Sequence, residues 1–355
     1  MRHKAFFSLI VSFAAIILSS FSAQAQGPDL DFLNHNQPIL DAHNCYPYQG
    51  HWSDRIQRAL RSGFPVSIEQ DLAWYVDPAT GVGRVVVSHT SHPTGSEPTL
   101  EDYFFKQVRP VVEKAAAENK RDQWPVIVLH FDFKDNQAAL LKAVWQILGQ
   151  HEEWLSTAVK TSDPSKLSPI DRKPVLAITE ESDEQQKIFY DDLRVGERLR
   201  LFGSAHTHPI PKGMPMKELI HWAAIVTPEE LLSEPPTNYR RWWNSSWYAV
   251  EEGGEPHAGD WTAADNQRLR ALVDHAHKMG YWVRFYTLDG FAPADDQGWG
   301  PGYNFGSPEA VIPRWKAAIA AGVNFIATNQ YETLATYLDQ NAKELRATAD
   351  TSSGK

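Results

Sequence analysis

Residues 124–135 read WPVIVLHFDFKD, and this stretch decides the fold. A short apolar run, rich in β-branched residues and bounded by polar ones, predicts a strand buried on both faces. The next residues, QAALLKAVWQILGQ (137–150), have the apolar spacing of a helix. A buried strand followed directly by a helix is the repeating unit of a parallel sheet.

The same alternation recurs along the chain. Further strands are predicted at 37–43, 65–74, 84–90, 173–179, 198–204, 281–290 and 323–329, and further helices at 53–63, 99–120, 266–280 and 313–322. Seven or eight such units over this length favour an α/β fold of the TIM-type (β/α)8 barrel class over an open sheet. An irregular insertion is expected around 204–265, where segments 221–227 and 245–251 compete for one more strand.

The two ends of the chain are expected to lie outside the barrel. Residues 1–25 have a basic start, an apolar centre and a small-residue exit at Ala23 and Ala25, which predicts a signal peptide. The protein would then be secreted or periplasmic, with a retained membrane anchor as the alternative. Residues 26–340 are predicted to form a single barrel domain, and residues 341–355 a polar tail.

Composition limits the partners of the protein. The chain has 34 basic and 44 acidic residues and a net charge of −10. An acidic chain of this kind argues against nucleic acid as a partner, because binding to phosphate backbones requires basic surfaces. Cys45 is the one cysteine, so no internal disulfide can form. The oligomeric state is left open.

Ionisable residues gather where the predicted strands end. In a TIM barrel the carboxyl ends of the strands form the face that holds the active site. Acids one residue apart on a strand share a face, and their repulsion destabilises the fold unless a cation or hydrogen bonds compensate it. The residues expected to meet at this face are His43, Glu69, Asp71, His89, Asp132 and Lys134.

These residue types predict a metal-dependent reaction on a phosphodiester. Glu69, Asp71 and Asp132 offer hard oxygen ligands, which suit one divalent cation, Mg²⁺ or Ca²⁺. His43 and His89 suit proton transfer in the two directions that such a cleavage needs. Lys134 is expected to contact a phosphoryl oxygen. The structural alternative is that the two acids of the second strand pair with arginines at the sheet end and take no part in catalysis.

The ordered set resembles a known superfamily. His43, Glu69-x-Asp71, His89 and Asp132-x-Lys134 follow one another as in the phospholipase C-like phosphodiesterases, which share a TIM-type barrel. AHNCY (42–46) resembles the start of the phosphoinositide-specific group, which implies Asn44 as a further cation ligand. The segments GYWVRFYTLDG (280–290) and ATNQYE (327–332) resemble the last strands of the glycerophosphodiester and toxin groups, and Trp282 and Asn329 are expected there as substrate contacts.

The resemblance implies a phosphoric diester hydrolase. Its substrate would be a small diester or the headgroup of a phospholipid or glycerophosphodiester, with transient contact to a membrane surface. Two other classes stay open. His206 and His208 in SAHTHP (204–209) have the spacing of metal-dependent amidohydrolases. An inactive barrel could instead bind lipid through Trp242, Trp243 and Trp247. His92 competes with His89 as the second histidine.

Overall fold

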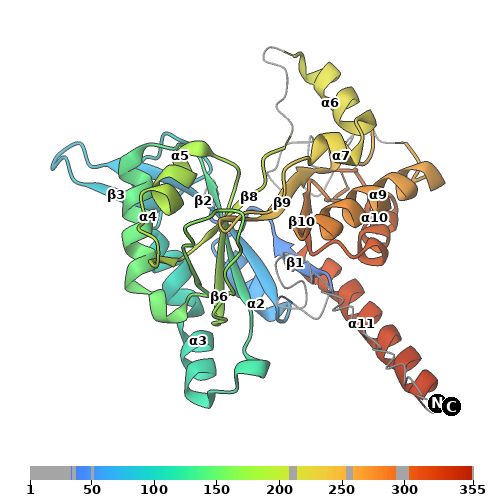
Figure 1. Ribbon diagram of the computed structural model, residues 1–355, viewed down its shortest axis with the longest axis horizontal. Helices are drawn as coiled ribbons and strands as arrows, with labels where there is room; N and C mark the ends of the chain where they lie inside the picture. The colour runs from blue at the N-terminus through green and yellow to red at the C-terminus, as the bar shows by residue number, and fades with distance from the viewer. Residues whose placement is uncertain are drawn as a thin grey trace, which may run out of the picture.

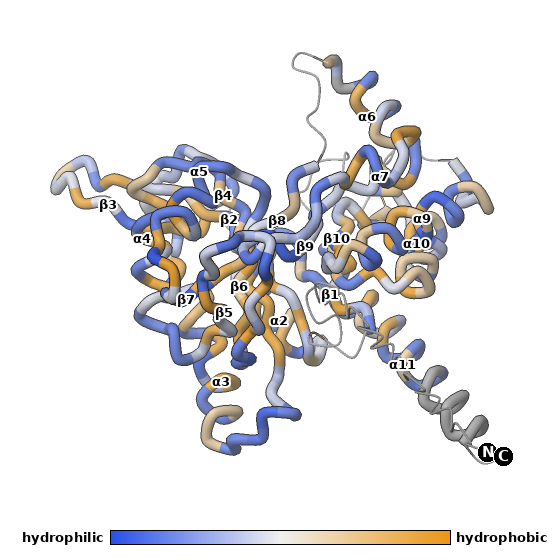
Figure 2. The backbone as a smooth tube through the Cα atoms, in the orientation of Figure 1, coloured by the Kyte–Doolittle hydropathy of each residue, from blue (hydrophilic) through white to orange (hydrophobic). Residues whose placement is uncertain are grey.

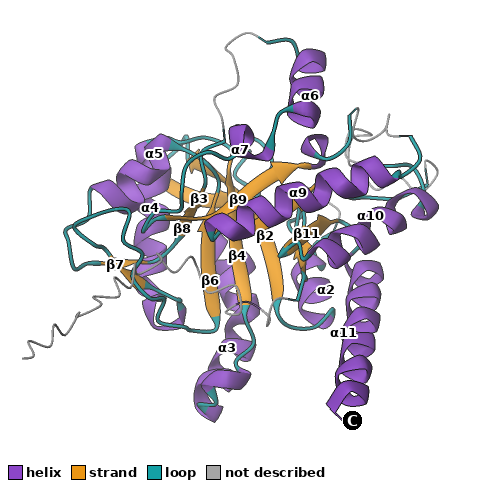
Figure 3. Ribbon diagram, turned by 45° about the vertical axis from the view of Figure 1, so that its right-hand side comes forward, coloured by secondary structure: helices purple, strands orange, loops and turns teal. Residues whose placement is uncertain are grey.

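Eight parallel strands close into a barrel in the computed structural model, which describes residues 33, 37–48, 52–207, 214–252, 259–292 and 304–353. Each strand pairs with the next, and the last pairs with the first, which closes the ring (Figures 1 and 3). The prediction of a TIM-type (β/α)8 barrel is therefore confirmed. The barrel strands are β1 (Ile39–Ala42), β2 (Val66–Val76), β4 (Ile127–Phe133), β6 (Val175–Thr179), β8 (Phe202–Ser204), β9 (Arg240–Ser246), β10 (Trp282–Tyr286) and β11 (Phe325–Thr328).

Helices follow the strands and cover the outside of the barrel (Figure 3). Thr262 and Ser307 accept backbone hydrogen bonds at the starts of α9 and α10, and Gly280 and Gly322 end these helices in the left-handed conformation. The longer helices are α2 (Arg55–Arg61), α3 (Lys106–Glu118), α4 (Ala138–Gln150), α6 (Met216–Ile225), α9 (Ala263–Met279), α10 (Pro308–Ala321) and α11 (Tyr331–Ser353). No helix in the described ranges is long and apolar enough to cross a membrane.

Short elements fill the connections. A π-helical turn, η1 (Glu101–Phe105), opens α3, and a two-stranded antiparallel sheet joins β5 (Ala158–Val159) to β7 (Arg198–Leu199). The others are η2 (Arg121–Gln123), η3 (Glu152–Trp154), α5 (Asp183–Gln186), η4 (Lys187–Asp191), α7 (Pro228–Leu231) and η5 (Trp247–Ala249). The segment predicted as a polar tail continues α11 as far as Ser353. The predicted signal peptide, residues 1–25, lies outside the described residues.

The sixth barrel strand differs from both segments proposed for it. It is β9, with the sequence RRWWNSS, whereas most of 221–227 lies in α6 and most of 245–251 lies beyond the end of β9. Trp242, Trp243 and Trp247 are fully buried. Trp242 and Trp243 pack in the interior because a barrel strand is covered on both faces, and Trp247 lies in η5 directly after that strand. These three tryptophans therefore form no exposed surface that could bind a lipid, as the alternative of an inactive lipid-binding barrel required.

The segment predicted as a strand at 84–90 is not part of the barrel. It forms β3 (Gly83–Val87), which pairs antiparallel with the far half of β2. β2 has 11 residues and continues past the barrel mouth, and β3 runs back along it. This hairpin returns the chain to the mouth, where the Ser88 amide donates to the Asp71 carbonyl over 2.9 Å.

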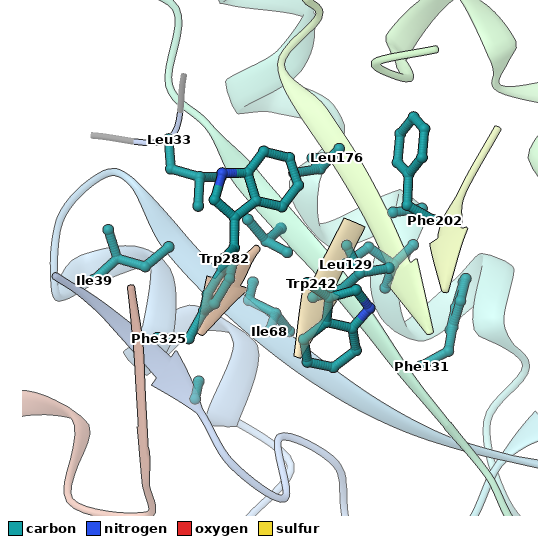
Figure 4. Packing of buried hydrophobic residues seen from close by; sticks show 14 of the residues in the cluster. Leu33, Ile39, Ile68, Leu129, Phe131, Leu176, Phe202, Trp242, Trp282 and Phe325 are labelled. Atoms are coloured by element: carbon teal, nitrogen blue, oxygen red, sulfur yellow. The ribbon is translucent and has the colours of Figure 1, made fainter. Parts of the chain in front are cut away.

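The lower barrel is filled by apolar side chains. Trp242, Trp282 and Phe325 are fully buried there, and the rings of Trp242 and Phe325 lie 6.4 Å apart (Figure 4). The hydropathy of the backbone follows the same division, since the stretch around β6 is hydrophobic while the chain near β8 and β9 is mostly polar (Figure 2). Closing the barrel floor in this way leaves its upper layers for polar side chains.

Candidate metal and acid–base site

Polar side chains occupy the two upper layers of the barrel interior. Alternate residues of a strand share one face, so each strand that sends one polar residue inward can send a second at the next level. Pairing in register places Glu69 beside His130 and Asp71 beside Asp132. The inward pairs are Asp41 and His43 at β1, Glu69 and Asp71 on β2, His130 and Asp132 on β4, and Arg284 and Tyr286 on β10.

Three carboxylates converge as the sequence predicted. Ligand oxygens of Glu69, Asp71 and Asp132 all lie within 4.8 Å of one another. Asp71 is fully buried, and its Oδ1 atom has no hydrogen-bond partner among the described residues. An unpartnered buried carboxylate oxygen is costly, and metal coordination would remove that cost. This cluster could hold a metal ion.

The electrostatics of the cluster favour a cation. Burial raises the pKa of Asp71, and the neighbouring Asp132 carboxylate raises it further. Burial also raises the pKa of Glu69 well above its ordinary value, although the Arg284 guanidinium opposes this shift. Lys134 donates to Asp71 and Asp132 over 2.7 Å each. Burial opposes its charge, but the two carboxylates outweigh burial and raise the pKa of Lys134.

His89 is held against the cluster by Asp71. Its Nδ1 atom lies 2.7 Å from Asp71 Oδ2 and 2.7 Å from the Tyr46 hydroxyl. The ring stacks on Tyr46 and meets the edge of Tyr48. A carboxylate that holds Nδ1 orients the imidazole and leaves Nε2 for proton transfer. His92 is exposed and bonds Ser91, so of the two competing histidines the structure brings His89 to the mouth.

His43 lies on the other side of the cluster. Its Nε2 atom is 3.8 Å from Glu69 Oε1, and its Nδ1 atom is 3.1 Å from the amide nitrogen of Asn44. Burial and the nearby Arg284 hold the pKa of His43 well below its ordinary value of 6.5, so the ring is neutral at neutral pH. The Asn44 carbonyl oxygen accepts from the Tyr46 hydroxyl over 2.6 Å. The structure therefore commits this oxygen to Tyr46 rather than directing it to the three carboxylates.

A buried arginine supports the site from below. Arg284 bonds Asp41, donates to Glu69 over 2.5 Å and donates to Asn244 over 2.9 Å. His130 is fully buried beside it, 3.7 Å from Glu69 and 3.3 Å from Glu180. Arg284 offsets part of the negative charge of Asp41 and Glu69, and it holds the Glu69 carboxylate in place. The alternative that the acids of the second strand pair with arginines therefore holds for Glu69, which pairs with Arg284, whereas Arg84 donates to the Gly95 carbonyl.

The site opens into a cavity of about 160 Å³ at the barrel mouth, which fits only a small substrate. The residues that line it are His43, Asn44, Glu69, His89, Asp132, Lys134, Glu180, Arg284 and Tyr286. A larger cavity of about 640 Å³ is lined by Pro65 and Val126, which directly precede β2 and β4, and thus lies at the opposite end of the barrel.

Sequence reasoning missed several members of the site. Arg284 and Tyr286 lie at period two from Trp282, and His130 lies at period two before Asp132, so the alternation that identified the acids could have found them. Tyr46 carries no such signal, because it lies in the loop after β1. Its position is known only from its contacts to Asn44 and His89.

The remaining predicted site residues lie elsewhere. Trp282 is the first residue of β10 and is fully buried at the closed end of the barrel, away from the cavity. Asn329 is buried just after β11, where it donates to Asp289 and accepts from Arg55. His206 bonds Glu181 at the rim and takes no part in the carboxylate cluster. Its proposed metal partner, His208, lies outside the described residues.

No protein-family model matches the chain, and no curated protein sequence matches it. Among solved structures, the chain is similar to 7,8-dihydropteroate synthase from Vibrio fischeri, with 11% identity, a TM-score of 0.37, and coverage of 87% of this chain and 93% of that one. It is also similar to wild-type HPPK-DHPS from Plasmodium falciparum with pteroate, with 12% identity, a TM-score of 0.36, and coverage of 89% and 50%. The chain spans about half the length of the Plasmodium structures that it matches.

These comparisons correct the predicted activity. The similar structures are described as dihydropteroate synthases, and none of those reported is a phosphoric diester hydrolase. The prediction of a phosphodiesterase that cleaves a phospholipid or glycerophosphodiester headgroup, together with its place in lipid metabolism, is wrong. At this level of similarity the matches assign no activity to the chain either, so its function must be argued from the site.

Proposed function

We propose that the barrel mouth is a divalent-cation-dependent active site that transfers protons on a small oxyanion. The observation that carries the proposal is the convergence of Glu69, Asp71 and Asp132 next to a histidine that Asp71 orients. A cation held by the three carboxylates would bind and polarise a substrate oxygen, and the nearby histidines would exchange protons with the substrate.

Charge balance supports the cation. Asp41, Glu69, Asp71, Asp132 and Glu180 gather in or beside the cavity, and among the described residues only Lys134 and Arg284 lie with them as permanent cations. An oxyanion would be repelled from such a cavity unless a divalent cation offset the excess negative charge. Carboxylate oxygens favour a hard ion, so we propose Mg²⁺ or Ca²⁺, with water or substrate oxygens as the remaining ligands.

The size of the cavity and the position of Lys134 limit the substrate. A space of about 160 Å³ suits a small carboxylate or phosphate rather than a lipid or a polymer. The Lys134 ammonium lines this cavity, where it can add a hydrogen bond to the bound anion. Tyr286 closes one side, with its ring 6.4 Å from that of His43.

Calorimetric titration of the purified protein tests the proposal. Mg²⁺ or Ca²⁺ is expected to bind with one equivalent per chain, and oxalate or inorganic phosphate is expected to bind only to the cation-loaded protein. The variant His89→Asn should bind the cation as the wild type does, because the ring bonds Asp71 without belonging to the carboxylate cluster. If neither cation binds at millimolar concentration, the proposed function is wrong.

A further inference from the structure

Hydrogen bonds of known direction lead from Arg55 to the barrel mouth. An arginine side chain can only donate, and its Nη1 atom lies 2.7 Å from one side-chain atom of Asn329. That atom must therefore be the carbonyl oxygen Oδ1. The amide nitrogen of Asn329 correspondingly faces the Asp289 carboxylate, 2.6 Å away. The orientation of the Asn329 amide is thus set by a charged partner on each side.

Asn329 in turn sets the orientation of Asn44. Its oxygen faces the Asn44 side chain over 3.4 Å, so the Asn44 atom on that side must be the donor Nδ2. The Asn44 oxygen then faces the Tyr46 hydroxyl at 2.6 Å. An amide oxygen can only accept, so the Tyr46 hydroxyl donates its proton to Asn44. The backbone of Asn44 is left-handed, with φ of 53°, a conformation that asparagine tolerates better than most residues.

This hydrogen-bond network places the ring proton on different nitrogens in the two histidines. The Asn44 Nδ2 atom, which can only donate, lies 3.1 Å from His43 Nδ1, so a neutral His43 ring carries its proton on Nε2. The Tyr46 hydroxyl donates its one proton to Asn44. His89 Nδ1, which lies 2.7 Å from the hydroxyl oxygen of Tyr46, must therefore donate to that oxygen. The Asp71 carboxylate, also 2.7 Å away, favours the same Nδ1–H form of His89.

We infer that Asn44 is a positioning residue that gives His43 and His89 opposite tautomers. His43 presents an N–H to the cavity and donates a hydrogen bond to the substrate, whereas His89 presents an unprotonated Nε2 and acts as the base. The contact of His43 Nε2 with Glu69 Oε1, at 3.8 Å, agrees with an N–H on that side of the ring. The assignment of roles rests on the proposed function, but the tautomers themselves do not.

Nitrogen NMR of the histidine rings tests the inference without a substrate. Protein labelled with ¹⁵N-histidine would be studied at neutral pH with chelator, and the two rings would be assigned from His43→Gln and His89→Gln. We expect a protonated Nε2 and an unprotonated Nδ1 for His43, and the reverse for His89. The same tautomer in both rings, or a protonated Nδ1 in His43, would overturn the inference.

Two variants test the part that Asn44 plays. Asn44→Gly keeps the left-handed backbone and removes the donor, so the His43 nitrogens should shift towards a mixture of tautomers while those of His89 stay as they were. Asn44→Asp replaces the donor with an acceptor and should move the His43 proton to Nδ1. Folding would be checked by circular dichroism, and Asn44→Gly decides if the aspartate variant does not fold. An unchanged His43 spectrum in Asn44→Gly refutes the role of Asn44.

The outcome is separable from that of the proposed function. If the tautomers are as assigned but no divalent cation binds, the proposed function fails and the positioning role stands. If the cation binds but both rings share one tautomer, the site stands and the inference fails.

Discussion

The ammonium group of Lys134 lies 2.7 Å from the Oδ2 atom of Asp71, which is fully buried. The lysine follows β4, and the aspartate lies on the neighbouring β2. The contact therefore joins two strands at the point where a cation would be bound. Lys134 partly offsets the carboxylate charge, and it also competes with any metal ion for the same oxygens.

Replacing Lys134 is expected to separate these two effects. Lys134→Met leaves Asp71 without its counterion and should lower the free energy of unfolding by about 2 kcal/mol without cation, less than for a fully buried pair because Asp132 is 33% exposed. The affinity for Mg²⁺ or Ca²⁺ should rise at least about tenfold, because a competing positive charge is removed. Denaturation with and without cation measures both. Lys142→Met, at an exposed position on α4, is the control, and a lower cation affinity in Lys134→Met would contradict the account.

Asp132 is expected to be required for cation binding. Asp132→Asn removes one of three charged ligands and should weaken the binding of Mg²⁺ or Ca²⁺ by a factor of about ten or more. The folded state should be little affected, because the asparagine can still accept from Lys134. Asp122→Asn makes the same change of charge at an exposed position by the opposite cavity. Equal cation affinities in the two variants would show that Asp132 is not a ligand.

Cation binding is expected to depend on pH. The pKa of Glu69 is raised by burial well above its ordinary value of 4.5, and that of Asp71 is raised above 3.8. A carboxyl whose pKa is raised on folding stabilises the fold at pH values below the pKa that it has in the unfolded chain. This stability is lost as the pH rises through its pKa in the folded protein. The cation-free protein should therefore lose this contribution above about pH 4, while the cation compensates the charges that form.

The measurement is the melting temperature with chelator and with saturating Mg²⁺ or Ca²⁺. The gap between the two curves should widen as the pH rises above 4.5, the ordinary pKa of Glu69, and cation binding should release protons wherever these carboxyls are still protonated. A gap that stays constant over this range would contradict the raised pKa values of Glu69 and Asp71.

The barrel could be predicted because its signals are local. Buried parallel strands read as short apolar runs, and the helices between them carry periodic apolar faces and capping residues. The strand β9 could not be predicted, because it begins with two arginines, Arg240 and Arg241, and charged residues at this position are typical of a loop. In the folded chain, Arg240 donates to the Ser204 carbonyl, and Arg241 donates to the Asn238 carbonyl and lies over Phe202. These partners exist only after folding.

The candidate site was predictable to the extent that it follows strand alternation. Glu69 and Asp71 share a face, and so do Asp132 and Lys134, so their convergence follows from the barrel itself. His89 reaches the site for a different reason. An antiparallel hairpin outside the barrel returns it to the mouth, and a strand outside a barrel has the same apolar pattern as one inside. The activity could not be predicted, because the same acids and histidines serve many reactions.

The last prediction concerns Arg284, which holds Asp41 and Glu69 in the lower polar layer. All three side chains are at least 96% buried, so the acids cannot turn to water when their partner is lost. Arg284→Met is expected to lower the free energy of unfolding by about 3–5 kcal/mol, the cost of leaving buried charge unpaired. Adding Asp41→Asn should recover part of this loss, because it removes one of the two carboxylates that Arg284 pairs with. Chemical denaturation of the single and double variants gives the coupling energy. Strict additivity would mean that the two residues do not interact energetically, and Arg284 would then stabilise the barrel through packing alone.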